Sequence, residues 1–144
     1  MMRSTKSWLP KLRPDQRPKV VPDRRGRMLV PTPMLVARAV RRVPSGRLIT
    51  AETLRARLAR SARVDLTCPM TTGIFLNIIA GAAEEELARG HRPVAPYWRV
   101  VRADGSLPEK FPIPMGLHAA HLRAEGHRLA RGRVTDLERT LVRR

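Results

Sequence analysis

Apolar residues recur at helical spacing in three segments of the chain. Over residues 33–43 they return every three or four positions, and Pro33 follows the capping residue Thr32, an order typical of a helix start. A second segment follows Thr50 and continues to residue 62, and a third covers residues 71–88. This period of about 3.6 residues predicts three helices, each with an apolar face.

The pattern changes after the third helix. Residues 94–107 combine an apolar run with an Asp104-Gly105 pair, which is typical of a turn between two strands. A final short helix is expected at about residues 116–125, closed by Gly126. Three helices followed by a hairpin form the pattern of a winged helix-turn-helix domain. The predicted fold class is therefore α+β, mainly helical, with a short β-hairpin wing.

The two ends of the chain lack helical periodicity. Residues 1–27 hold four prolines, nine Lys or Arg residues and two acidic residues, and Trp8 is their only large aromatic residue. Segments of this composition bury too little apolar surface to fold. We therefore expect a disordered basic arm at 1–27, a winged-helix domain at 28–129 and a loose basic tail at 130–144.

The composition is strongly basic, with 29 Lys and Arg residues against 12 Asp and Glu residues and a formal net charge of +17. Such an excess favours a polyanionic partner, because neutralised phosphates release their counterions. Nucleic acid is the first candidate, and an acidic membrane surface is the second. No apolar run reaches the ~18 residues that span a bilayer. We expect DNA as the partner and no membrane insertion.

The single cysteine, Cys68, excludes an intrachain disulfide and a cysteine-based metal site. A chain of this kind fits a reducing compartment, so we expect a cytoplasmic or nucleoid location. The four histidines have no acidic partner at metal-ligand spacing. We expect neither a metal ion nor another cofactor.

Four motifs occur in an order that one family shares. They are VPSGRLIT at 43–50, CPMTTG at 68–73, PYWRVVRADGSL at 96–107 and LRAEGH at 122–127. Over about residues 29–129 the chain therefore resembles the C-terminal domain of the O6-alkylguanine-DNA alkyltransferases. The resemblance implies a DNA-binding winged-helix fold that offers one helix to the duplex.

The catalytic residues of that family are replaced in this chain. The family's central motif is Pro-Cys-His-Arg-Val, and a glutamate on the last helix orients the histidine. Here Tyr97 replaces the cysteine, Trp98 the histidine and Ala119 the glutamate. Alkyl transfer needs a thiolate, and a phenol with a pKa near ~10 and no neighbouring base does not replace it. The resemblance thus implies the alkyltransferase-like branch, which binds alkylated guanine and flags it for repair.

The chain also departs from that branch. Its members carry an arginine finger where this chain has Thr72 or Gly73, and a tyrosine where it has Ala51. The family's substrate loop corresponds here to PEKFPIPMG, residues 108–116. The third helix has no basic residue and carries Glu84–Glu86 near its end, which we expect to form a solvated face.

DNA contacts are expected from the start of the third helix and from basic residues around it, namely Thr71, Thr72, Asn77, Arg55, Arg99 and Arg102. Hydroxyl, amide and guanidinium groups are common ligands of phosphates and base edges. The aromatic pair has two interpretations. Either Pro96, Tyr97 and Trp98 form the wall of a lesion pocket and stack on a base, or they pack in a retired active site.

The leading functional hypothesis is a monomeric, non-catalytic alkyltransferase-like protein that binds duplex DNA, senses alkylated guanine and has a repair-protein partner. The alternative is a basic adaptor or RNA-associated protein that kept the fold and lost lesion recognition. The missing arginine finger and the acidic helix end motivate this alternative. A third hypothesis, an active transferase that uses Cys68, has only the thiol in its favour.

Overall fold

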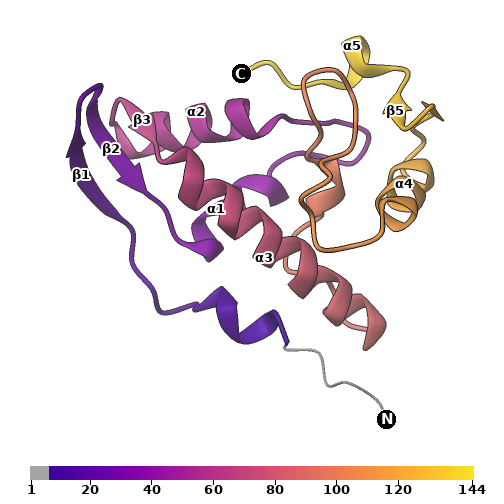
Figure 1. Cartoon of the computed structure of the whole chain (residues 1–144), viewed down its shortest axis with the longest axis horizontal. Coiled ribbons are helices and arrows are strands. Elements are labelled where there is room, and N and C mark those ends of the chain that lie inside the picture. The colour runs from indigo at the N-terminus through magenta and orange to yellow at the C-terminus, as the bar shows by residue number, and fades with distance from the viewer. Residues whose placement is uncertain (1–6) are drawn as a thin grey trace.

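The computed structural model describes residues 7–144 (Figure 1). Its α-helices are α1 (Pro33–Arg41), α2 (Ala51–Ala62), α3 (Pro69–Ala88), α4 (Met115–Ala124) and α5 (Leu137–Thr140). Its strands are β1 (Lys19–Asp23), β2 (Gly26–Val30), β3 (Leu66–Thr67), β4 (Leu129–Ala130) and β5 (Arg133–Val134). Short 3-10 helices cover η1 (Leu9–Leu12) and η2 (Tyr97–Arg99). The predicted helices and the mixed α+β class are confirmed.

Helix α3 forms the centre of the fold, and α1, α2, η1 and η2 pack against it (Figure 1). Its middle, from Leu76 to Ala83, is mostly apolar and largely buried, as expected for a helix enclosed by its neighbours. The first turns of α3 are different, because Met70, Gly73 and Ile74 are exposed there. The start of α3 is therefore the part that a large ligand can reach.

Capping residues fix the starts of α1 and α2. Thr32 Oγ1 accepts a hydrogen bond from the Leu35 N–H, and Thr50 Oγ1 accepts one from the Thr53 N–H, each at 3.1 Å. These bonds satisfy backbone donors that a helix start leaves free. Ile49, next to the second cap, forms a parallel bridge with Val100, which holds the first turn of α2 beside the segment after η2.

The prediction of a disordered arm is wrong for residues 7–27; residues 1–6 lie outside the described part. Strand β1 pairs antiparallel with β2, and β2 pairs in parallel with β3, which gives a three-stranded sheet. Before the sheet, the Glu85 carboxylate of α3 accepts hydrogen bonds from the Ser7 hydroxyl at 2.5 Å and from the Trp8 N–H. The proline in β1, Pro22, is compatible with pairing because β1 is an edge strand.

The basic tail at 130–144 is also ordered, contrary to the prediction. Strands β4 and β5 form a small antiparallel ladder. Further on, the Val142 N–H donates to the Leu48 carbonyl at 2.7 Å, and Leu141 forms a bridge with Leu48. Val134 and Val142 are buried in the core. The tail is therefore part of the folded domain, held by partners about a hundred residues away in sequence.

The predicted wing is present as a turn without a strand ladder of its own. The Arg102 N–H donates to the Ser106 carbonyl at 2.9 Å, and Gly105 has a φ of 85°, a backbone conformation that favours glycine. The two arms pair elsewhere, since Val100 bridges Ile49 and Ser106 bridges Arg133. Prolines at 96 and 108 flank the turn, and a proline cannot donate to a ladder, which keeps such a hairpin short.

A glycine allows the N-terminal segment to dock on α3. A Cβ atom added at Gly81 would collide with the Trp8 ring. We expect Gly81→Ala to displace Trp8, lower the unfolding free energy by about 1–3 kcal/mol and speed proteolysis after Lys11. Gly73→Ala in the same helix is the control. Nothing lies within 4 Å of its added Cβ, so it should stabilise by about 0.5–1 kcal/mol. Urea unfolding and limited trypsin digestion measure both effects, and equal behaviour of the two variants would contradict the docking.

Candidate nucleic-acid interface

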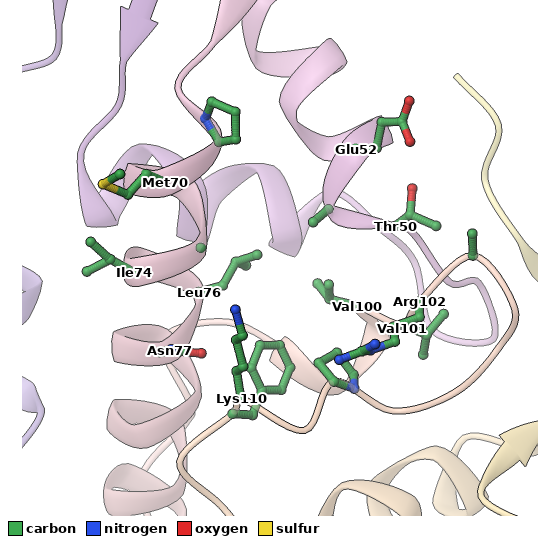
Figure 2. A pocket seen from close by; sticks show the side chains of 16 residues that line it. Thr50, Glu52, Met70, Ile74, Leu76, Asn77, Val100, Val101, Arg102 and Lys110 are labelled. Atoms are coloured by element: carbon green, nitrogen blue, oxygen red, sulfur yellow. The ribbon is translucent and has the colours of Figure 1, made fainter.

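A pocket of about 570 Å³ opens beside the start of α3. Its walls come from α3, from the first turn of α2, from residues 100–103 and from residues 108–111. Figure 2 shows the side chains of Leu76, Asn77 and Lys110 pointing into the space between these elements. A mostly apolar cavity of this size with a few polar groups is typical of a ligand site.

Some residues of the pocket wall occupy positions that the family resemblance singled out. Ala51, at the position of the family's tyrosine, lines it, and so do Pro108, Lys110 and Phe111 of the segment that corresponds to the substrate loop. The alanine methyl group takes up less space in this wall than a tyrosine ring would. The polar groups that remain in the wall are Thr50, Glu52, Asn77, Arg102 and Lys110.

The aromatic pair lies behind this pocket and is not part of its wall. Tyr97 is completely buried, and Trp98 is 9% exposed. Neither they nor Pro96 belong to the pocket lining. Tyr97 makes an edge contact at 5.8 Å with Phe111, whose ring does line the pocket. The geometry thus corrects the assignment of all three as pocket-wall residues and favours the packing interpretation.

A carboxylate on α3 holds the aromatic pair in place. The Tyr97 hydroxyl donates to Glu84 Oε2 at 2.5 Å, and His121 Nε2 of α4 lies 2.7 Å from the same oxygen. The Trp98 ring stacks on His121, with centroids 4.2 Å apart and planes 18° apart. Burial raises the pKa of Tyr97 far above its usual range, and the hydrogen bond to Glu84 and its charge add to the rise. The phenol therefore stays neutral and is no nucleophile.

Arg99, predicted as a DNA contact, is committed to the protein interior. Its Nε and Nη2 donate to the Glu125 carboxylate, Nη2 at 2.6 Å, and its Nη1 donates to the Val43 carbonyl at 2.6 Å. Burial alone would raise the pKa of Glu125, but hydrogen bonds from its neighbours, with Arg99 the strongest donor, and the Arg99 charge together outweigh it and lower the pKa. Bidentate hydrogen bonds from a largely buried arginine have a structural role. The prediction that Arg99 binds a phosphate is therefore wrong.

The threonines at the start of α3 differ in access. Thr72 is buried, and its hydroxyl donates to the Cys68 carbonyl at 2.8 Å, so it is not a DNA contact. Thr71 is half-buried and donates to Cys68 Sγ at 3.0 Å. Burial raises the pKa of the Cys68 thiol, but hydrogen bonds from Thr71 and the Met70 N–H outweigh it and lower the pKa. Cys68 does not line the pocket.

The triplet Glu84–Glu86 does not form the solvated face that we expected. Glu84 binds Tyr97 and His121, and Glu85 holds the N-terminal segment through Ser7 and Trp8. Glu86 accepts a hydrogen bond from the Val94 N–H at 2.7 Å. All three carboxylates are therefore used inside the fold. Their contacts reach residues eight or more positions away, so helical periodicity carried no signal of them.

Two basic residues line the pocket and two more line a side groove, where Arg25 is paired with Asp23 at 2.9 Å. A smaller cavity of about 220 Å³, lined by Arg25 and Arg55, shares Glu52 and Pro69 with the pocket. Arg102 and Lys110 lie on the pocket itself. Sequence reasoning selected Arg55, Arg102 and Asn77, and the structure brings these three to this surface. It missed Lys110 and Arg25, although Lys110 lies in the segment that corresponds to the family's substrate loop.

In residues 7–144, no group of three or more His, Cys, Asp or Glu side chains could hold a metal ion. No helix in this part of the chain is long and apolar enough to cross a membrane.

This arrangement of helices and strands is also the fold of a solved protein structure. It matches the crystal structure of S. pombe Atl1 in complex with damaged DNA containing O6-carboxymethylguanine, with a TM-score of 0.53 and 16% sequence identity. The match covers 78% of this chain and 94% of the Atl1 chain. At this identity the similarity establishes the fold. No protein-family model and no curated protein sequence matches the chain.

A buried histidine behind the pocket makes stability depend on pH. His118 Nε2 lies 2.9 Å from the Trp98 carbonyl oxygen, so the Nε2–H donates to that oxygen. Burial lowers the pKa of His118 from 6.5 to about 4. Between these values the unfolded state binds the proton and the folded state does not, so stability falls as the pH falls.

We expect the protein to lose about 2 kcal/mol of unfolding free energy through His118 between pH 7 and pH 5. His118→Asn should remove this part of the loss, and His91→Asn, at an exposed histidine, should leave it unchanged. Urea unfolding at the two pH values measures it. The same pH dependence in wild type and His118→Asn would show that His118 titrates normally.

Proposed function

We propose that this protein binds duplex DNA, holds an alkylated guanine base in the pocket beside α3, and marks it for repair proteins without transferring the alkyl group. The observation that carries the proposal is the pocket itself, whose wall includes Ala51 and residues of the segment that corresponds to the family's substrate loop. A protein of the same fold, S. pombe Atl1, was crystallised with damaged DNA containing O6-carboxymethylguanine.

The lining of the pocket suits a modified purine. Leu76 and Phe111 offer apolar surface to the ring faces and to an alkyl group. The Asn77 amide supplies both a donor and an acceptor, and the Lys110 ammonium supplies donors for guanine acceptor atoms. A base in a duplex can reach this pocket only after rotation out of the stack. Lesions that weaken pairing lower the free-energy cost of that rotation.

The absence of alkyl transfer in the proposal rests on the chemistry around Tyr97. Its hydroxyl is buried, neutral and bound to Glu84. His121, the histidine that stacks on Trp98, is bound to the same carboxylate. The residues that line the pocket include no cysteine. An alkylated base in the pocket therefore meets no thiolate.

One of the two observations that favoured the adaptor alternative no longer supports it. It was based on the acidic end of α3, yet Glu84, Glu85 and Glu86 all bind groups of this same chain. They do not present a repulsive carboxylate face to a phosphate backbone. Duplex DNA is therefore the partner that we propose, and tighter binding of RNA is the result that would favour the alternative.

A first experiment compares duplexes that contain one O6-methylguanine or one plain guanine, by fluorescence anisotropy over a salt series. We expect tighter binding of the lesion duplex, and a preference that persists as salt rises, because a pocket contact depends less on salt than a phosphate contact does. Ala51→Phe should fill the pocket and remove the preference while general binding remains. Ala120→Phe, at an exposed position of α4, is the control.

Equal affinity for the two duplexes would rule out the lesion pocket, and tighter binding of matched RNA would favour the adaptor. The intact mass of the protein after incubation with the lesion duplex should stay unchanged. A mass increase of one methyl group on Cys68 would contradict the non-catalytic part.

A second experiment tests the basic surface. Arg102→Ala and Arg55→Ala should each weaken binding of both duplexes and reduce the slope of log K against log salt by about 0.9, the effect of one lost phosphate contact. Arg123→Ala removes an exposed arginine of α4, outside the pocket and its side groove, and should leave the slope unchanged. Equal slopes in all three variants would place the phosphate contacts elsewhere.

A further inference from the structure

The hairpin of β1 and β2 presents basic side chains to solvent. Figure 1 shows its two strands at one side of the molecule, beside β3 and away from α4. Its one carboxylate, Asp23, is paired with Arg25 at 2.9 Å. The other cations of the hairpin are exposed and form no ion pair within residues 7–144; they are Lys19, Arg24 and Arg27. Residues 19–27 therefore carry a net charge of +3.

Hydrogen bonds attach this hairpin to the segment that leads into α3. The carboxylate of Asp65, just before β3, accepts a hydrogen bond from the Arg27 N–H at 2.7 Å, and the Asp65 N–H donates to the Arg27 carbonyl at 3.0 Å. Gly26 fits against the Asp65 carboxylate because it has no Cβ atom. The Cys68 N–H, at the cap of α3, donates to the Leu29 carbonyl at 2.9 Å. The backbone of the hairpin is therefore fixed beside the start of α3, and such pre-organisation lowers the cost of binding a ligand.

The tip of the hairpin reaches the side groove that leads to the pocket. Arg25 lines this groove together with Arg55, and the groove shares Glu52 and Pro69 with the pocket. The groove follows α2 from Glu52 to Ala59, a rise of about 10 Å, which is the axial length of about three base steps. A duplex that lies along this groove, with its modified base in the pocket, therefore has flanking phosphates within reach of the hairpin tip.

Protection of the sheet edge does not account for these charges. Edge strands commonly carry charged residues and prolines that prevent pairing with another chain, and Lys19 and Pro22 on the edge strand β1 fit this role. Arg24 lies at the turn and Arg27 on the central strand β2, where no edge needs protection. Arginine binds phosphate through two parallel hydrogen bonds, and the major groove of DNA admits a two-stranded ribbon. A nucleic-acid duplex is therefore the partner that fits this arrangement.

We propose that the β1–β2 hairpin is a second DNA-binding element, in which Arg24 and Arg27 bind phosphates that flank the lesion. The inference rests on the duplex binding proposed above and adds contacts outside the pocket. Residues 19–27 precede the region that the family resemblance covers, so the resemblance assigns them no role. Figure 1 shows the hairpin and the orange segment of residues 100–110 on opposite sides of the start of α3. Phosphate contacts from the hairpin position the duplex, and the choice of base is left to the pocket.

The test compares the full chain with Arg24→Ala/Arg27→Ala, by fluorescence anisotropy on the O6-methylguanine and plain duplexes over a salt series. The double variant should reduce the slope of log K against log salt by about 1.8, the effect of two lost phosphate contacts, and bind both duplexes roughly tenfold more weakly. The ratio of the two affinities should not change. Hydroxyl-radical footprinting should show protection lost on one flank of the lesion only. Arg27 binds Asp65 through backbone atoms, so the melting temperature should not fall.

The control is Arg92→Ala/Arg123→Ala, which removes the same charge from two exposed arginines outside the pocket and its side groove. It should keep the slope and the footprint of the wild type. An unchanged slope or footprint in Arg24→Ala/Arg27→Ala would overturn the second element and leave DNA binding intact. An equal loss of slope in the control would also overturn it, because net charge alone would then explain the effect. A loss of slope seen only with matched RNA would overturn it in favour of RNA binding. Failure of wild type to bind either duplex would refute the proposed function itself, on which the hairpin contacts depend.

Discussion

The hydrogen bond from the buried Tyr97 hydroxyl to Glu84 joins three parts of the molecule. Glu84 belongs to α3, Tyr97 to η2, and His121, which shares the carboxylate, to α4. A buried hydroxyl or carboxylate without a partner costs free energy, so the three elements are held in one arrangement. The Tyr97 ring in turn supports Phe111, which lines the pocket. The shape of the pocket therefore depends on a contact that lies behind it.

The same contact occupies the position at which the family resemblance places a nucleophile. A cysteine that attacks an alkyl group must reach the pocket as a thiolate. Tyr97 fills the equivalent place with a larger ring whose polar atom faces away from the pocket, toward α3. Trp98 covers His121 and brings its carbonyl to His118. The side chains at 97 and 98 thus pack with α4 in one continuous layer, so a substitution at either position should also disturb α4.

Local signals predicted the parts of the fold that depend on local interactions. Thr32 and Thr50 cap the helices that their sequence positions indicated. The arm and the tail were wrongly predicted to be unstructured because the residues that hold them are distant in sequence. Trp8 packs where Gly81 has no side chain, and the Val142 N–H donates to the Leu48 carbonyl. Arg99 was misassigned for the same reason, since Glu125 lies 26 positions away. A single sequence shows that a residue is basic, but only the fold shows whether its charge is already neutralised.

The start of α3 combines features that would be unfavourable in an isolated protein. Exposed methionine and isoleucine side chains gain nothing from water, and a glycine in the first turns lowers helix stability relative to alanine. Met70, Gly73 and Ile74 lie within five residues of one another, at the edge of a pocket and among cations. Elsewhere α3 follows packing rules closely, with its middle buried and its three glutamates all bonded. The departure from those rules is therefore confined to the part of the helix that lines the pocket, and functional sites are where such departures are expected.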